Sequence, residues 1–141
     1  MHISRREREV EWGDCDPAGI VFNPRFFEWF DAATAGIFTS LGLPKAQMLS
    51  RFNCAGIPLV ETRARFLAPS KFGDRVVIES GIAEFGRSSF KVEHRLFNKG
   101  ALCVEGFETR VWTGRDPADA SRLKSQPIPV EVIALFQAGA S

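Results

Sequence analysis

The segment NPRFFEWFDAATAGIFTSLG, residues 23–42, carries the strongest structural signal in this chain. Apolar residues recur in it at helical spacing: Phe26, Phe30, Ala33, Ile37 and Leu41. This period predicts an amphipathic helix over residues 24–41. Asn23 is a suitable N-terminal cap, and Pro24 fits the first turn, where its missing N–H costs no hydrogen bond. Gly42 is expected to end the helix, whose wide aromatic face requires a sheet to cover it.

Beyond the helix, the apolar pattern changes from helical to strand spacing. Runs rich in Val, Ile, Phe and Thr predict strands near residues 57–67, 74–84, 88–98 and 101–113. Turn signals lie between these runs, at 71–74, Gly86 and 98–100. An edge strand is expected at 3–12, a short helix at 44–52 and a tail helix near 130–137. This order predicts an α+β fold, in which a long helix packs on an antiparallel sheet.

A sheet of this kind, formed by one chain, leaves its outer strands unpaired. Unpaired strand edges expose N–H and C=O groups that a second copy can satisfy. The chain is therefore expected to form a homodimer or a homotetramer.

The bulk composition restricts the possible classes of protein. A length of 141 residues suits one domain spanning 1–141. The formal net charge of +1 argues against a nucleic-acid partner, because proteins that bind nucleic acids usually carry a strong excess of basic residues. No apolar run is long enough to span a membrane, and the charged segment 1–11 lacks a signal core, so a cytoplasmic protein is expected.

The cysteines and histidines give only weak functional signals. The three cysteines lie far apart with no CxxC pair, so neither a disulfide framework nor a metal site is expected. Cys15 adjoins the most informative loop and is considered as a nucleophile, although a small unreactive thiol is the preferred interpretation. His94 alternates with Val92 and Leu96, which favours a structural histidine on one face of a strand.

That informative loop precedes the long helix and reads Gly13-Asp14-Cys15-Asp16-Pro17-Ala18-Gly19. Its carboxylate at Asp16 is a possible nucleophile or general base. The helix that follows offers free N–H groups and the positive end of its dipole, which stabilise a developing oxyanion. An aspartate before a helix is, however, more often a turn former, so spacing by itself leaves both interpretations open.

The loop and helix together resemble the 4-hydroxybenzoyl-CoA thioesterase family. The resemblance rests on residues 13–24 and on Trp29-Phe30-Asp31-Ala32-Ala33, and extends more weakly to about Trp112. It implies a hotdog fold, in which a sheet of about five strands wraps a long central helix. It also implies dimers, often paired into tetramers, with active sites at subunit interfaces. The implied reaction is hydrolysis of an acyl-CoA thioester without a metal or bound cofactor.

The resemblance also assigns roles to individual residues. Asp16 matches the catalytic aspartate, and the backbone N–H of Asn23 matches the oxyanion donor. The family often has Tyr at the latter position, whereas this chain contains no Tyr, which leaves the acyl specificity open. Asp31 matches an acidic position near the aryl pocket, with a solvated helix residue as the alternative. Gly19 is expected to contact substrate. The aromatic residues near the site predict substrate contacts for Phe22 and Phe26 as well, with packing in the core as the alternative for helix aromatics.

Contacts with the CoA moiety are assigned to side chains that carry basic or hydroxyl groups. Arg87, Ser88 and Ser89 match a turn that contacts the CoA nucleotide in related enzymes, with a plain hairpin turn as the alternative. Arg suits phosphate through its fork of donors. Arg122 and Lys124 are further candidates, with ordinary surface charges as the alternative.

The expected function is hydrolysis of an aromatic, hydroxybenzoyl-like CoA thioester, with Asp16 attacking the carbonyl or activating water. A thioesterase for short- or medium-chain aliphatic acyl-CoA is an alternative. A hotdog hydratase would normally use an Asp/His pair, and no histidine adjoins the Asp16 loop. A non-catalytic ligand-binding protein is the remaining alternative.

Overall fold

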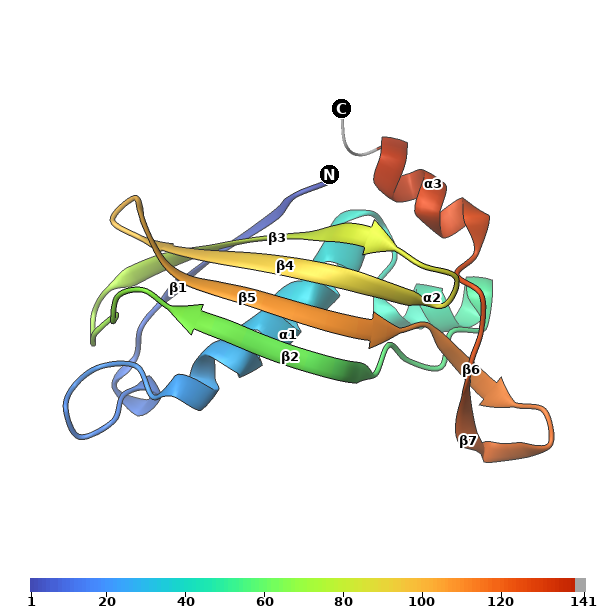
Figure 1. The fold of residues 1–141 in the computed structure, drawn as a ribbon, viewed down its shortest axis with the longest axis horizontal. Helices are drawn as coiled ribbons and strands as arrows, with labels where there is room; N and C mark the ends of the chain where they lie inside the picture. The colour runs from blue at the N-terminus through green and yellow to red at the C-terminus, as the bar shows by residue number, and fades with distance from the viewer. Residues whose placement is uncertain (139–141) are drawn as a thin grey trace.

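The computed structural model describes residues 1–138 and consists of one antiparallel sheet with a long helix on one face (Figure 1). The sheet has five strands in the order β1-β3-β4-β5-β2. Their bounds are β1 Ser4–Glu9, β2 Leu59–Phe66, β3 Arg75–Phe85, β4 Ser89–Asn98 and β5 Ala101–Val111. The α+β class and the sheet wrapped around a helix confirm the expected hotdog fold. Strands β1 and β2 form the two edges.

Helix α1 spans Asn23–Ser40 and buries one continuous face against the sheet. Its buried residues are Phe26, Trp29, Phe30, Ala33, Thr34, Ile37 and Phe38. The prediction that Asn23 caps this helix is wrong, because Asn23 is its first residue and the extended Phe22 precedes it. The carbonyl of Phe22 accepts the N–H of Arg25 at 2.8 Å and starts the helix without a side-chain cap.

The end of α1 follows the predicted signal. Gly42 adopts a positive φ of 77°, which glycine reaches without steric cost. The N–H of Leu43 donates to the carbonyl of Phe38 at 2.9 Å, and that of Gly42 donates to Thr39 at 3.0 Å. This is a Schellman termination, in which the buried Leu43 packs in the same core cluster as Phe38.

The hairpin between β4 and β5 is a tight two-residue turn. Asn98 pairs with Ala101, and the two residues between them, Lys99 and Gly100, both have positive φ, at 52° and 79°. Such a turn fixes the register of the two longest neighbouring strands. The register shifts by one residue between Phe97 and Leu96, and the shifted register places His94 directly opposite Gly106.

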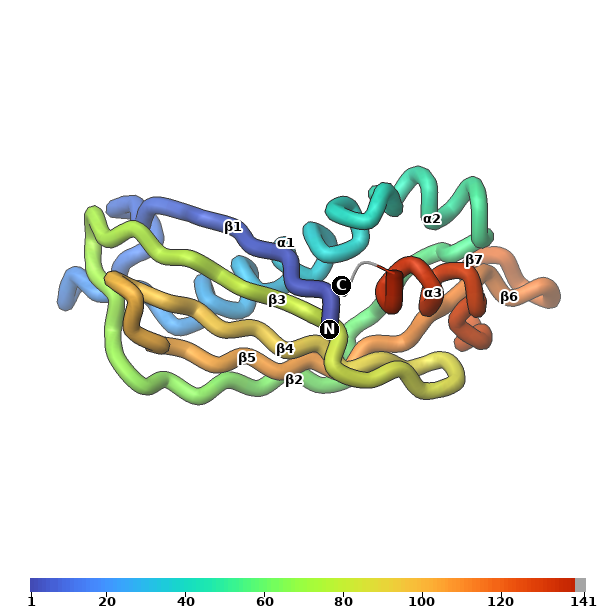
Figure 2. The backbone as a smooth tube through the Cα atoms, turned by 90° about the horizontal axis from the view of Figure 1, so that it is seen from above, coloured from blue at the N-terminus to red at the C-terminus, as the bar shows by residue number. Residues whose placement is uncertain are grey.

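Smaller elements gather at one end of the sheet (Figures 1 and 2). They are α2 Lys45–Phe52, α3 Val130–Ala138 and a hairpin of β6 Thr113–Asp116 with β7 Asp119–Ser125. The hairpin was not predicted, because β7 is exposed throughout and lacks the alternation of a half-buried strand. The loop over residues 13–22, which contains the 3-10 turn η1 Trp12–Asp14 at its start, lies at the opposite end.

Candidate active site

The segment between β1 and α1 folds back on itself as a small hairpin. The N–H of Phe22 donates to the carbonyl of Asp14, and the N–H of Asp16 donates to that of Ile20, both at 2.9 Å. Gly19 closes the turn with a φ of 82°, and its N–H donates to the Asp16 carbonyl at 2.9 Å. Asp16 and the start of α1 therefore lie on opposite arms of one hydrogen-bonded hairpin.

Asp16 is half-buried and keeps one carboxylate oxygen available. Its Oδ1 accepts the N–H of Ala18 at 2.9 Å, which is an Asx turn. Its Oδ2 has no hydrogen-bond partner among the described residues. This oxygen is the one that could attack a carbonyl or accept a proton from water.

The other arm of the hairpin presents a free backbone donor. The N–H of Asn23 is the first of α1 and has no hydrogen-bond partner within residues 1–138. The first N–H groups of a helix carry its positive dipole end, so this donor suits an anionic oxygen. A pocket of about 240 Å³ lies beside it, lined by Ile20, Asn23, Phe26 and Phe66 among others, with Asp16 outside the lining.

The two phenylalanines assigned to substrate differ in exposure. The side chain of Phe22 is 51% exposed, whereas that of Phe26 is 3% exposed. Phe26 packs against Trp29 and Phe66, with ring centroids 5.3 and 5.6 Å away, and also lines the pocket beside Asn23. Phe22 thus offers apolar surface to a ligand or a partner, whereas Phe26 offers a ligand at most one edge of its ring.

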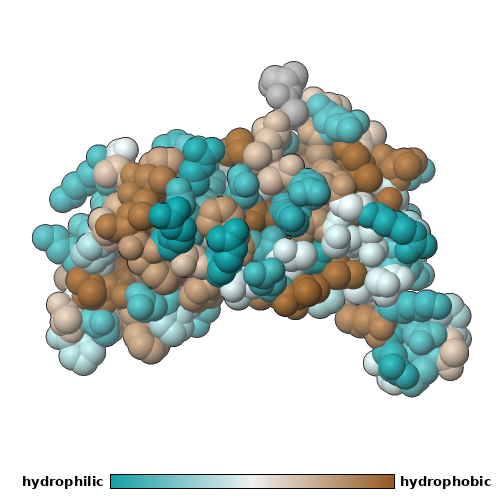
Figure 3. All heavy atoms as spheres, viewed as in Figure 1, coloured by the Kyte–Doolittle hydropathy of each residue, from teal (hydrophilic) through white to brown (hydrophobic). Residues whose placement is uncertain are grey.

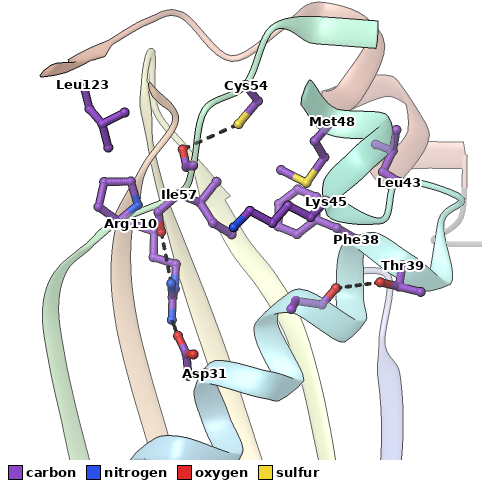
Figure 4. Close-up of a pocket in the computed structure, with 13 residues that line it drawn as sticks. Asp31, Phe38, Thr39, Leu43, Lys45, Met48, Cys54, Ile57, Arg110 and Leu123 are labelled. Atoms are coloured by element: carbon purple, nitrogen blue, oxygen red, sulfur yellow. Dashed lines mark hydrogen bonds and ion pairs between the residues drawn. The ribbon is translucent and has the colours of Figure 1, made fainter. Parts of the chain in front are cut away.

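A larger pocket, of about 530 Å³, lies farther along α1 (Figure 4). It is enclosed by α1, α2, the segment before β2, and residues of β5 and β7. Phe38, Leu43 and Met48 supply apolar walls, and Asp31 and Arg110 supply a charged pair at one side. Asp31 thus lines the larger pocket rather than the pocket beside Asn23.

A buried polar network supports this charged pair from beneath. Arg110 donates through Nη2 to Asp31 Oδ1 and through Nε to Glu108 Oε1, both at 2.7 Å. Burial by itself raises the pKa of Glu108, but hydrogen bonds from His94 and Arg110 hold that pKa below its usual value. Burial likewise opposes the charge of Arg110, but Glu108 and Asp31 raise the pKa of its guanidinium.

The network continues to His94, which is a buried structural histidine as predicted. Its Nε2 lies 3.1 Å from Glu108 Oε2, and its Nδ1 lies 2.6 Å from Ser80 Oγ. The ring stacks on Phe30 with centroids 4.7 Å apart. Thr34 of α1 donates to Glu108 Oε1 at 2.7 Å and ties the helix to the same carboxylate.

Sequence reasoning missed Glu108 and Arg110. Strand β5 alternates, so Val104, Gly106, Glu108 and Arg110 share its buried face. Two opposite charges on a face that is otherwise apolar or small were the available signal. Only the packing of α1 shows that they join Asp31 on one side and His94 on the other.

The residues assigned to CoA lie at the far end of the sheet from Asp16 (Figure 1). Arg87 and Ser88 lie in the turn between β3 and β4, and Ser89 is the first residue of β4. Arg122 and Lys124 are exposed on β7. The carbonyl of Ser88 accepts the N–H of Trp112 at 2.7 Å, which couples this turn to the start of the β6–β7 hairpin. A single copy of the chain does not bring these residues together with Asp16.

The cysteines, possible metal ligands and helices of the described residues complete the description of the chain. Cys15, Cys54 and Cys103 are free thiols, and burial raises the pKa of the Cys54 thiol. No group of three or more possible metal ligands occurs within residues 1–138. In the same residues, no helix combines the length and the apolar character needed to cross a membrane.

The chain matches a family model described as the Thioesterase-like superfamily over residues 10–136. It is 33% identical over 135 residues to the 4-hydroxybenzoyl-CoA thioesterase of Pseudomonas sp. (strain CBS-3), covering 92% of this chain and 94% of that enzyme. A 4-hydroxybenzoyl CoA thioesterase variant complexed with 4-hydroxybenzoyl CoA superposes with a TM-score of 0.87 and 31% identity, covering 96% and 99%. A gentisyl-coenzyme A thioesterase superposes with a TM-score of 0.80 and 35% identity, covering 92% and 99%.

Proposed function

Because this chain belongs to the thioesterase-like superfamily and is an acyl-CoA thioesterase, we propose that it hydrolyses an aromatic, hydroxybenzoyl-like CoA thioester to the free acid and CoA. One observation carries the proposal. The Oδ2 of Asp16 and the N–H of Asn23, neither of which has a hydrogen-bond partner within residues 1–138, lie on the two arms of one hairpin. The names of two similar proteins, which act on hydroxybenzoyl and gentisyl thioesters, support an aryl acyl group.

In the proposed mechanism, Asp16 either attacks the thioester carbonyl or takes a proton from an attacking water. The carbonyl oxygen becomes an oxyanion, and the Asn23 N–H at the start of α1 stabilises it. The intermediate collapses and expels the CoA thiolate. Direct attack yields a mixed anhydride with Asp16, which water then hydrolyses. Because the donor is a backbone group, it is retained although the side chain at position 23 is not tyrosine.

We further propose that the complete site forms between two copies paired through β2. This edge strand exposes Leu59, Val60 and Phe66, and hydrophobic atoms gather along the lower margin of the molecule, where β2 lies (Figure 3). Antiparallel pairing of β2 with its copy would set the Phe66 end of one against the Leu59 end of the other. Phe66 borders the pocket at Asn23, and Leu59 follows Pro58 of the larger pocket.

This pairing would place the catalytic hairpin of one copy beside the larger pocket of the other. The CoA residues assigned on β7 and on the β3–β4 turn lie at that same end. The acyl group would then enter the larger pocket, and Gly19 and Phe22 would border the thioester. The CoA phosphates would reach Arg87, Arg122 and Lys124, with hydroxyl donors from Ser88 and Ser89.

A thiol-release assay over aryl- and aliphatic-CoA thioesters tests the proposal. We expect 4-hydroxybenzoyl-CoA to have the highest kcat/KM, and Asp16→Asn to lower turnover by roughly 10²- to 10⁴-fold. Asp116→Asn is a matched control, because Asp116 begins a second turn with the sequence Asp-Pro-Ala. There, Asp116 Oδ1 accepts the N–H of Ala118 at 2.9 Å. Near-normal turnover of Asp16→Asn would remove Asp16 from the mechanism, and a preference for aliphatic thioesters would refute the aryl assignment.

Single-turnover hydrolysis in ¹⁸O-water distinguishes the two roles of Asp16. Label in the Asp16 carboxylate indicates direct attack, because only water that opens a mixed anhydride at the aspartyl carbonyl can place it there. Label in the product acid alone is the result expected both for the general-base role and for an anhydride that water opens at the acyl carbonyl.

A further inference from the structure

We propose that Arg110 is a positioning residue, which holds the Asp31 carboxylate at the wall of the larger pocket so that it accepts a hydrogen bond from a hydroxyl group on the acyl ring. The inference rests on the proposed function, since it assumes that the larger pocket receives the acyl group. It assigns a role in substrate selection to a side chain that lies almost entirely beneath the helix.

The contact between the two side chains leaves one oxygen of Asp31 for a ligand. Arg110 Nη2 donates to Asp31 Oδ1 at 2.7 Å, and Asp31 Oδ2 has no hydrogen-bond partner in the described part of the chain. The Asp31 side chain is 71% exposed, whereas that of Arg110 is 7% exposed. An exposed carboxylate on a helix normally samples several rotamers, so a buried donor on one oxygen restricts where the other oxygen points.

Arg110 is itself held at two further points of the structure. Its Nε donates to Glu108 at 2.7 Å, and its Nη1 donates to the carbonyl of Ile57 at 3.0 Å. Glu108 is fixed in turn by Thr34 and His94. The planar fork of an arginine serves these acceptors at once, whereas a lysine ammonium is a single point of charge on a flexible stem.

The residues that line the pocket suit such a contact. Its walls at Phe38, Leu43 and Met48 are apolar and suit a flat ring. The Asp31–Arg110 pair lies at the side where the segment before β2 approaches α1 (Figure 4). An acyl group that buries a ring against the apolar walls would therefore gain by carrying a hydrogen-bond donor toward Asp31. Acyl groups without such a donor would desolvate the second oxygen of Asp31 without offering it a hydrogen bond.

The experiment compares kcat/KM for 4-hydroxybenzoyl-CoA with kcat/KM for benzoyl-CoA, using the full-length protein. A hydrogen bond to a charged group predicts a ratio of about 10 to 100. Asp31→Asn should reduce this ratio about tenfold or more, and Arg110→Lys should reduce it to a similar extent. The loss should appear mainly in KM, because the distal hydroxyl is bound equally in the ground and transition states.

The double variant separates positioning from a general structural role. If Arg110 acts through Asp31, Arg110→Lys should leave the ratio unchanged when Asp31 is already Asn. Arg5→Lys is the matched control, since Arg5 lies on the opposite edge strand with a side chain 61% exposed, and it should keep the wild-type ratio. If Arg110→Lys does not fold, Glu108→Gln tests the same chain of contacts with little change in volume, and should also lower the ratio.

The outcomes distinguish the inference from the proposed function. Failure of the wild-type protein to hydrolyse aryl-CoA thioesters overturns both. If the protein hydrolyses aryl-CoA thioesters but Arg110→Lys leaves the kcat/KM ratio unchanged, only the role of Arg110 is overturned. Where Arg110→Lys does not fold, an unchanged ratio in Glu108→Gln has the same meaning. The role of Arg110 is also overturned if Arg110→Lys lowers the ratio as much in the Asp31→Asn background as in the wild type, since Arg110 would then act by another route.

Discussion

Gly106 of β5 lies directly against the ring of Phe30 from α1, and Gly106→Ala tests that packing. A Cβ built at this position would lie 2.5 Å from Cε2 and 2.6 Å from Cδ2 of Phe30. Carbon atoms pack best at about 3.5–4.0 Å, so the ring would have to retreat by roughly 1 Å. It has little freedom to do so, because it stacks on His94 at 4.7 Å and is 1% exposed.

The expected cost follows from two opposing terms. Overpacking of a well-packed core costs about 1–3 kcal/mol, and the immobile ring places this site in the upper part of that range. Alanine recovers about 0.5–1 kcal/mol relative to glycine in a strand. The free energy of unfolding should therefore fall by about 1–2.5 kcal/mol, which corresponds to a decrease in Tm of roughly 3–10 °C.

Urea unfolding at one fixed protein concentration measures this cost, because any dimer makes stability depend on concentration. Gly13→Ala is the control, since its Cβ would meet no atom within 4 Å, and it should change stability by less than about 0.5 kcal/mol. Phe30→Leu removes the ring edge that the new methyl would strike, so Gly106→Ala should cost less in that background. A Gly106→Ala protein as stable as the wild type, or an unchanged cost beside Leu at position 30, would refute the argument.

Three further predictions concern charge, backbone and assembly. In the folded protein the pKa of Glu108 lies below its ordinary value of 4.5, so the loss of stability in Glu108→Gln should be largest near neutral pH and should shrink as the pH falls through and below 4.5. Urea unfolding of both proteins at several pH values measures this loss, and a loss that does not change with pH contradicts the prediction. Gly42→Ala should lower the free energy of unfolding by about 1 kcal/mol because of its positive φ, whereas Gly36→Ala inside α1 should not, and thermal unfolding compares the two. Val60→Asp places a charge on the β2 edge, 65% exposed in one copy, and should shift dimers toward monomers in analytical ultracentrifugation; an unchanged sedimentation coefficient argues against pairing through β2.

Much of the local structure could be predicted from residues that are close in sequence. The aromatic period of residues 23–42 predicted α1, and Gly42 correctly marked its end. The hairpin at 98–100 followed from the turn preference of its residues, since Lys99 and Gly100 both adopt positive φ. The start of α1 was displaced by one residue, because an extended Phe22 and its carbonyl, rather than a polar side chain, begin the helix.

The candidate site could be predicted only in part. The carboxylate of Asp16 and the helix start were identified because they lie seven positions apart in one segment, Asp16–Asn23. The separation of the CoA candidates from Asp16 was not foreseen, because the sequence does not show at which end of the sheet a turn will lie. That separation is the reason for proposing a functional site shared between two copies.

The sequence by itself thus determined the long helix, the five strands of the main sheet, the turn at 98–100 and the candidate site segment Asp16–Asn23, because each depends on stereochemistry within a few residues. Only the tertiary structure decided which charges meet beneath the helix. Asp31 and Arg110 are 79 positions apart and Thr34 and Glu108 are 74 apart, so their contacts exist only after β5 has taken its place in the sheet. Hydrogen bonds of this kind depend on distances of a few ångströms between remote segments, and no local pattern in the chain encodes those distances.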